Sequence, residues 1–78
     1  MLTFSAAVVV ATDCARREGR SQVIAEAAGR ADPERFVIGP SKGWHPRPDR
    51  WMIRAKVSDA SLELAVLGDW EPPSEPTT

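Results

Sequence analysis

The residues best suited to chemistry or binding lie in one stretch, Gly39–Trp51. Its candidate partner-binding residues are Lys42, Trp44, His45, Arg47, Arg50 and Trp51. Basic groups neutralise phosphates and Trp rings stack on bases, as a contact with RNA or single-stranded DNA requires. Trp and Arg are also enriched among the residues that dominate protein–protein binding energy. A third interpretation is a proline-stiffened surface loop whose Trp rings pack back onto the edge of the sheet.

The charge balance favours a protein partner over nucleic acid. The formal net charge is -1 and the sequence pI is about 5.7, whereas nucleic-acid footprints usually occur in basic domains. A second basic patch is formed by Arg16 and Arg20, with Arg17 between them, and it could contact a phosphate or an acidic protein. A solvated helix start is the more ordinary interpretation of that patch.

Catalytic and metal chemistry receive little support from the sequence. His45 is the one histidine, and metal sites need a cluster of ligands, so we predict no metal, no cofactor and no catalytic residue. A nucleophilic pair of Cys14 with His45 would depend on the fold bringing them together. A small ribonuclease-like toxin using His45 and arginines is the remaining enzymatic alternative. The run 39–43 contains Gly and Lys but lacks the order of a phosphate-binding loop.

The length and the charge distribution indicate one domain with a tail. A chain of 78 residues allows a single domain, which we place at residues 1–68. Residues 69–78 are acidic and proline-rich, and we expect them to be a flexible tail. All 10 basic residues lie between positions 13 and 58, while residues 59–78 carry acidic charges only. A partner, or self-association into an oligomer, is expected to add stability to so small a core.

The chain start and the single thiol favour a cytoplasmic protein. No positively charged segment resembling a signal peptide precedes the first apolar run, and an unpaired Cys14 suits a reducing compartment. No stretch is long and apolar enough to predict a membrane span. The bias toward Arg and Ala is typical of GC-rich coding sequences and favours a bacterial or bacteriophage source.

Hydrophobic periodicity predicts four strands and one helix. Residues 2–12 alternate and are rich in β-branched side chains, which is typical of a strand. A helix is expected within 13–31, best supported over 21–31, because its apolar residues recur at spacings of three and four. Further strands are expected at 35–39, 50–57 and 61–67, the last two as a hairpin in which Arg54 or Lys56 faces Glu63. A helix over 61–67 is the alternative.

The expected fold is therefore α+β: a small two-layer domain of β-α-β-β-β order. One helix packs on one face of a mostly antiparallel sheet and leaves the other face open. The favoured function is a non-catalytic protein-interaction module, an inhibitor or accessory subunit of a larger machine. RNA or single-stranded DNA binding through the same loop is the alternative.

Overall fold

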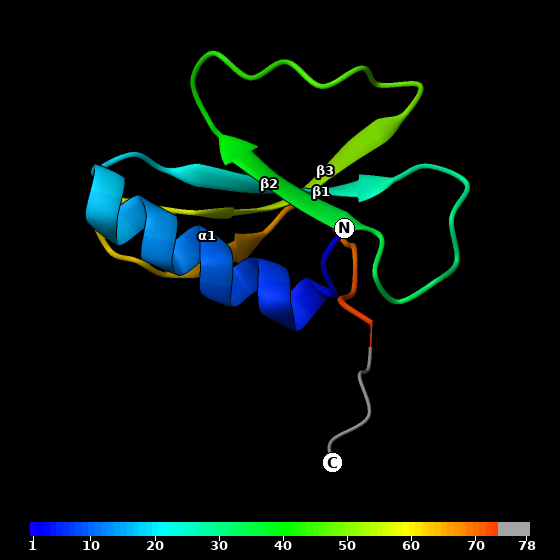
Figure 1. The fold of residues 1–78 in the computed structure, drawn as a ribbon, viewed down its shortest axis with the longest axis horizontal. Helices are drawn as coiled ribbons and strands as arrows, with labels where there is room; N and C mark the ends of the chain where they lie inside the picture. The colour runs from blue at the N-terminus through cyan, green and yellow to red at the C-terminus, as the bar shows by residue number, and fades with distance from the viewer. Residues whose placement is uncertain (74–78) are drawn as a thin grey trace.

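The computed structural model describes residues 1–73 and shows one helix packed on a four-stranded sheet (Figure 1). The elements are α1 (Phe4–Glu18), β1 (Gln22–Ala27), β2 (Phe36–Pro40), β3 (Trp51–Val57) and β4 (Leu64–Val66). The strand order is β2-β1-β3-β4, and every neighbouring pair is antiparallel. The helix covers one face of this sheet, so the predicted two-layer α+β architecture is confirmed.

The helix comes first in the chain, and the predicted strand at 2–12 is wrong. Thr3 caps the helix, its side-chain oxygen accepting a hydrogen bond from the Ala6 amide at 3.2 Å. Gly19 ends it in the left-handed conformation, with φ of 65°. The buried residues recur at helical spacing: Phe4, Ala7, Ala11 and Ala15. The helix thus buries alanines and leaves Val9 and Val10 exposed, which gives residues 2–12 the appearance of a strand.

The helix predicted within 13–31 is correct for residues 13–18, which end α1, but wrong over 21–31, because the first half of that stretch forms β1. This strand lies in the interior of the sheet, between β2 and β3. Its residues Ile24, Ala25 and Ala27 are buried although neighbouring side chains on a strand point to opposite faces. Burial on both faces removes the alternation that normally reveals a strand. The next turn contains Gly29, with a positive φ of 76°, which prevents the element from continuing.

The hairpin between β3 and β4 is confirmed, and the alternative helix over 61–67 is wrong. Ala55 pairs with Val66 and Val57 with Leu64. The register between β1 and β3 shifts at Ile24 and Ala25, leaving Arg54 as an extra residue in β3. Its guanidinium bonds to Glu26 instead of facing Glu63 as predicted.

Glu26 holds a nearly buried ion cluster beside the core. Its two carboxylate oxygens accept hydrogen bonds from Arg35 and from Arg54, the latter at 2.8 Å. Burial by itself would raise the pKa of Glu26, but the hydrogen bonds and positive charges of the two arginines outweigh it and lower that pKa below 4.5. The cluster therefore joins β1 to β3 and to the residue that precedes β2.

Three aromatic rings fill one end of the core. Phe4 lies 5.3 Å from both Phe36 and Trp70 between ring centroids, each in an edge-to-face arrangement. The Arg54 guanidinium lies over the Trp70 ring at 5.4 Å. The packed structure thus extends past the predicted boundary at residue 68, at least to Trp70. Residues 74–78 of the predicted tail lie outside the described residues.

Candidate partner-binding groove

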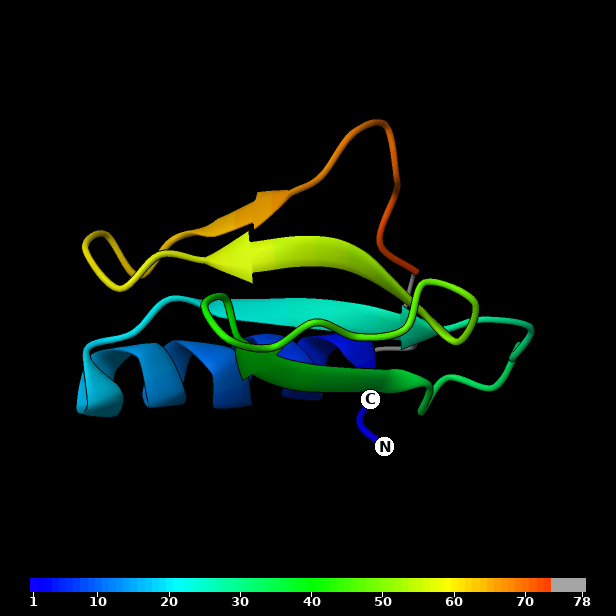
Figure 2. The same cartoon turned by 90° about the horizontal axis from the view of Figure 1, so that it is seen from above.

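The segment 41–50 links β2 to β3 by crossing the face of the sheet that α1 leaves open (Figures 1 and 2). Its first end is fixed by a hydrogen bond from the Ser41 amide to the Ser21 carbonyl at 2.9 Å. Its second end is fixed by the Arg47 carbonyl, which accepts bonds from the Arg50 and Trp51 amides at 3.0 and 2.8 Å. The segment forms no regular element, as predicted, but these backbone hydrogen bonds fix both of its ends.

Trp44 anchors the middle of this segment on β2. Its indole lies so close to Gly39 that a Cβ placed there would be 2.4 Å from the Trp44 Cε3 atom. Only glycine allows a ring to approach the strand backbone this closely. The interpretation in which Trp rings pack back onto the sheet edge is therefore confirmed for Trp44, which is half-buried.

A hollow of about 480 Å³ lies between this segment and β3. We call it the Trp groove, and it is lined by Val23, Ser41, Trp44, His45, Pro46, Pro48, Trp51, Met52 and Ile53. Trp51 enters it from β3 and Trp44 from the loop, and both rings remain partly exposed. The volume falls within the range of about 300–1,000 Å³ found for ligand sites. The fold thus brings three predicted residues together, Trp44, His45 and Trp51.

The other predicted residues do not line the groove. Arg47 forms an exposed ion pair with Asp49 at 3.0 Å, and Arg50 is exposed at the end of the segment. Lys42 lines a different hollow. In the second predicted patch, Arg16 and Arg17 both bond to Asp13, at 2.8 and 3.0 Å. Arg16 and Arg20 do not share a helix face, because α1 ends at Glu18.

Most of the basic side chains are neutralised within the chain. Those in ion pairs are Arg16, Arg17, Arg30, Arg35, Arg47 and Arg54. Among residues 1–73, the basic side chains outside such pairs are Arg20, Lys42, Arg50 and Lys56. Nucleic-acid affinity depends on cations that are free to replace counterions at phosphates. The basic middle of the sequence therefore does not become a continuous basic surface.

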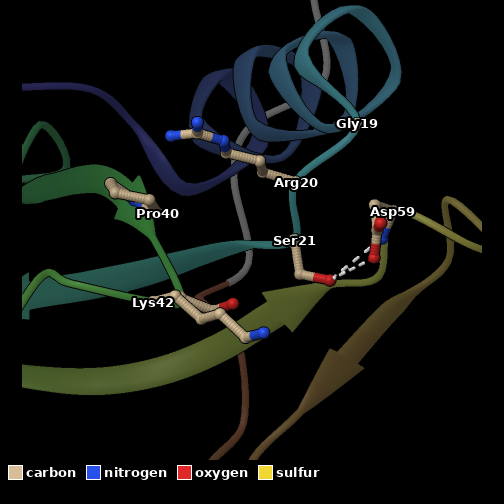
Figure 3. Close-up of a pocket in the computed structure, with 7 residues that line it drawn as sticks. Gly19, Arg20, Ser21, Pro40, Lys42 and Asp59 are labelled. Carbon is tan, nitrogen blue, oxygen red and sulfur yellow. Dashed lines mark hydrogen bonds between the residues drawn. The ribbon is translucent and has the colours of Figure 1, made fainter.

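A second hollow, of about 430 Å³, lies where α1 meets the ends of β1 and β2 (Figure 3). The Ser21 hydroxyl donates a hydrogen bond to the Asp59 carboxylate at 2.7 Å and accepts one from the Asp59 amide at 3.1 Å. The side chains of Arg20 and Lys42 point in opposite directions. An anion here would meet one carboxylate and no converging cations, so this hollow is not a phosphate site.

The nucleophilic pair of Cys14 with His45 is not formed in the structure. Cys14 lies on α1 and His45 on the segment across the opposite face, so the sheet separates the two members of the suggested nucleophilic pair. Within residues 1–73, no three His, Cys, Asp or Glu side chains gather in a way that could hold a metal ion. No helix in that part of the chain is long and apolar enough to cross a bilayer.

The groove also has an apolar floor, Val23 and Ile53, and two prolines, Pro46 and Pro48, none of which the sequence singles out as binding residues. The sequence predicts a helix around Val23, and this prediction conceals its position on β1 beneath the loop. Ile53 had been placed correctly on a strand with Trp51, and that shared face was the available signal. No protein-family model, curated protein or solved structure matches the chain.

Proposed function

We propose that this chain is a non-catalytic protein-interaction module and that the Trp groove binds an extended segment of a partner protein. One observation carries the proposal: two half-buried Trp side chains from separate elements, Trp44 and Trp51, line one apolar hollow. Trp is the residue type most enriched where interfaces gain their affinity. The module would serve as an inhibitor or accessory subunit of a larger assembly.

The groove is organised before any partner arrives. Trp44 is seated on Gly39, and Pro46 and Pro48 restrict the backbone that carries it. A ring that is already fixed loses little conformational entropy on binding, so more of its contact energy appears as affinity. This rigidity supports a binding role for the loop.

The rim of the groove favours a partner segment with acidic groups. Arg50 is exposed where the loop ends and lies outside the ion pairs among residues 1–73, whereas Arg47 is already paired with Asp49. Rim charges add little affinity, but they steer encounter and select against basic partners. An extended segment with apolar or proline residues flanked by carboxylates matches both the floor and the rim.

A comparative capture experiment tests the proposal. Tagged wild-type chain, Trp51→Ala and Val9→Ser are incubated with lysate of the native cell, with and without nuclease, and bound proteins are quantified by mass spectrometry. Val9 is the matched control, because it is a 68% exposed apolar residue on α1, in the layer on the other side of the sheet. Circular dichroism verifies that each variant is folded.

We expect the wild-type chain to capture one protein in stoichiometric amount, with or without nuclease, and the Val9→Ser variant to capture it equally well. Trp51→Ala should reduce its recovery at least tenfold, because a hot-spot Trp contributes about 2 kcal/mol or more. Equal recovery with Trp51→Ala would show that the groove is not the interface. A signal that disappears with nuclease would replace the proposal with nucleic-acid binding.

A further inference from the structure

The two edges of the sheet differ in which backbone groups they leave unpaired. At the β2 edge, the Phe36 amide and carbonyl bond to Leu2 at 2.9 and 2.7 Å. Pro40, at the other end of β2, has no amide hydrogen. Within residues 1–73, Ile38 is thus the one residue of β2 whose outward amide and carbonyl are both unpaired. A covering segment and an edge proline prevent another strand from adding to a sheet, so this edge is protected.

The opposite edge, formed by β4, is open. Glu63 accepts a backbone hydrogen bond at 3.3 Å from the residue that follows β3, and Leu67 donates one at 2.8 Å to Arg54 within β3. Alternate residues of an antiparallel strand face its neighbour, so Leu64 and Val66 direct their amides and carbonyls away from β3. Within residues 1–73 these outward groups have no partner. The β4 edge therefore offers two donors and two acceptors to an added strand.

The side chains of β4 also suit an added strand. Leu64 lies opposite the buried Val57 and Val66 opposite the buried Ala55, so both face the layer of α1. Leu64 is nevertheless exposed, because β4 is the last strand of the sheet (Figure 2). The strand contains no proline, glycine or charged residue, which are the types that block pairing at an edge. An apolar side chain beside Leu64 would extend the core past this edge.

Unpaired carboxylates lie at both ends of β4. Glu63 directly precedes the strand, and Asp69 and Glu71 follow it on a segment that bends outward past its end (Figure 2). All three are exposed, and none belongs to an ion pair within residues 1–73. Lys56 is the nearest unpaired base and lies one strand inward, opposite Ala65. A second copy would bring the same carboxylates to this edge, whereas a basic segment would neutralise them.

We infer that the β4 edge binds an extended basic segment of a partner protein, which adds to the sheet as a further strand. Residues opposite each other on neighbouring strands share a face, so the positions opposite Leu64 and Val66 take apolar side chains. One basic residue falls opposite Glu63, and another falls at the end of β4 that leads to Asp69. The segment therefore has the order basic, apolar, polar, apolar, basic. Main-chain hydrogen bonds supply affinity in this mode, and the side chains supply specificity.

This edge is separate from the Trp groove. The groove lies on the face that α1 leaves open and is lined from β3 by Trp51, Met52 and Ile53, none of which is in β4. The inference consequently goes beyond the proposed function and does not depend on it. The segregation of acidic residues after position 58 would then serve a second contact of its own.

Nuclear magnetic resonance of the ¹⁵N-labelled full chain with the capped peptide Lys-Val-Thr-Val-Lys tests the inference. The Leu64 and Val66 amides should exchange rapidly with solvent in the free chain, and saturating peptide should slow their exchange and shift their signals. The peptide Glu-Val-Thr-Val-Glu should bind roughly tenfold more weakly or less. Glu63→Lys should reduce this preference, whereas Glu34→Lys, at an exposed carboxylate in the turn between β1 and β2, is the matched control and should retain it. Equal binding of both peptides to the wild type would overturn the charge complementarity.

Methylated peptides show whether the contact uses the backbone. In an added antiparallel strand, the two Val residues exchange hydrogen bonds with Leu64 and Val66, while the Thr amide faces away. Methylation of both Val nitrogens should therefore weaken binding roughly tenfold or more, because it removes two donors. Methylation of the Thr nitrogen is the matched control and should leave binding unchanged. Equal loss from both peptides would contradict strand addition.

The same spectra distinguish this inference from the proposed function. A peptide that shifts the Trp44 and Trp51 signals but not the Leu64 and Val66 amides would overturn the inference and leave the groove as a binding site. Protection of both amides in the peptide-free chain would also overturn it. A mass of twice 8.5 kDa in sedimentation velocity would then identify a second copy as the occupant of the edge.

Discussion

Gly39→Ala is the substitution that most sharply tests how the groove is built. Gly39 does not have a positive φ, so alanine fits its backbone conformation without strain. At such a position, Gly→Ala normally stabilises a protein by about 0.4–1 kcal/mol through the unfolded state. The sign of the effect therefore depends on what the new methyl group meets.

The methyl group meets the Trp44 indole at three atoms. An ideal Cβ would lie 2.4, 2.5 and 2.9 Å from Cε3, Cδ2 and Cζ3. Optimal carbon–carbon separations are about 3.5–4.0 Å, so the rigid ring has to move by roughly 1 Å or more. Overpacking of this kind typically costs about 1–3 kcal/mol. Once the stabilisation through the unfolded state is subtracted, we expect Gly39→Ala to lower the free energy of unfolding by about 1–2 kcal/mol.

A double-mutant cycle isolates that contact. Urea unfolding is measured for the wild type, Gly39→Ala, Trp44→Ala and the double variant. Without the indole, Gly39→Ala should be neutral or slightly stabilising, so the coupling between the two sites should reach about 1–3 kcal/mol. If Gly39→Ala destabilises equally in both backgrounds, Trp44 does not rest on Gly39 and the groove is not formed as described.

Three further substitutions, together with one control, test other parts of the fold. Ala11→Leu should destabilise the fold by about 1–3 kcal/mol in urea unfolding, because its fully buried position faces the sheet. The control Val9→Leu should change the free energy of unfolding by no more than about 0.5 kcal/mol. A larger loss of stability for Val9→Leu than for Ala11→Leu would contradict the orientation of the helix. Trp70→Ala should cost about 2–4 kcal/mol by removing an aromatic ring from the core, and a neutral result in thermal unfolding would place Trp70 outside it. Glu26→Gln should cost about 2 kcal/mol at pH 7, because two charged hydrogen bonds are weakened. The folded-state pKa of Glu26 is lowered, so its contribution is complete above pH 4.5 and is lost as the pH falls through the lowered value. The difference in free energy of unfolding between wild type and Glu26→Gln should therefore become smaller below pH 4.5. A difference that stays constant down to pH 2 would refute the ion cluster.

The fold class could be predicted from the sequence, whereas the order of its first two elements could not. Alternation in 2–12 and a helical spacing in 21–31 each suggested the opposite element. Both errors arise because residues are buried whose types do not suggest burial. In α1 the alanines face the sheet, and in β1 the buried Glu26 and Ala25 hide the period of a strand.

Local signals for the correct assignment were present. Thr3 precedes the apolar run and Gly19 follows it, as capping residues do at the two ends of a helix. The later hairpin was predictable because residues 50–57 and 61–67 both alternate in the sequence and a predicted turn lies between them.

The candidate site was predictable in part. The concentration of Trp, His and Pro in Gly39–Trp51 identified the segment, and its aromatic members do meet in one groove. The roles of the arginines were not predictable, because Arg47 and Arg54 find carboxylates that lie on the same loop or on another strand. Trp70 lies in the core because the chain after β4 comes back to the start of α1, where Trp70 contacts Phe4, and no local pattern reveals this long-range contact.

Nuclear magnetic resonance of the three indole N–H groups addresses the groove most directly. Acidic, neutral and basic proline-containing hexapeptides are titrated into uniformly ¹⁵N-labelled chain. Trp44 and Trp51 line the groove, while Trp70 packs in the core and serves as an internal control. Binding at the groove predicts saturable shifts of the Trp44 and Trp51 signals with an unchanged Trp70 signal. If no peptide shifts the first two, or if all three move together, the groove is not a peptide-binding site.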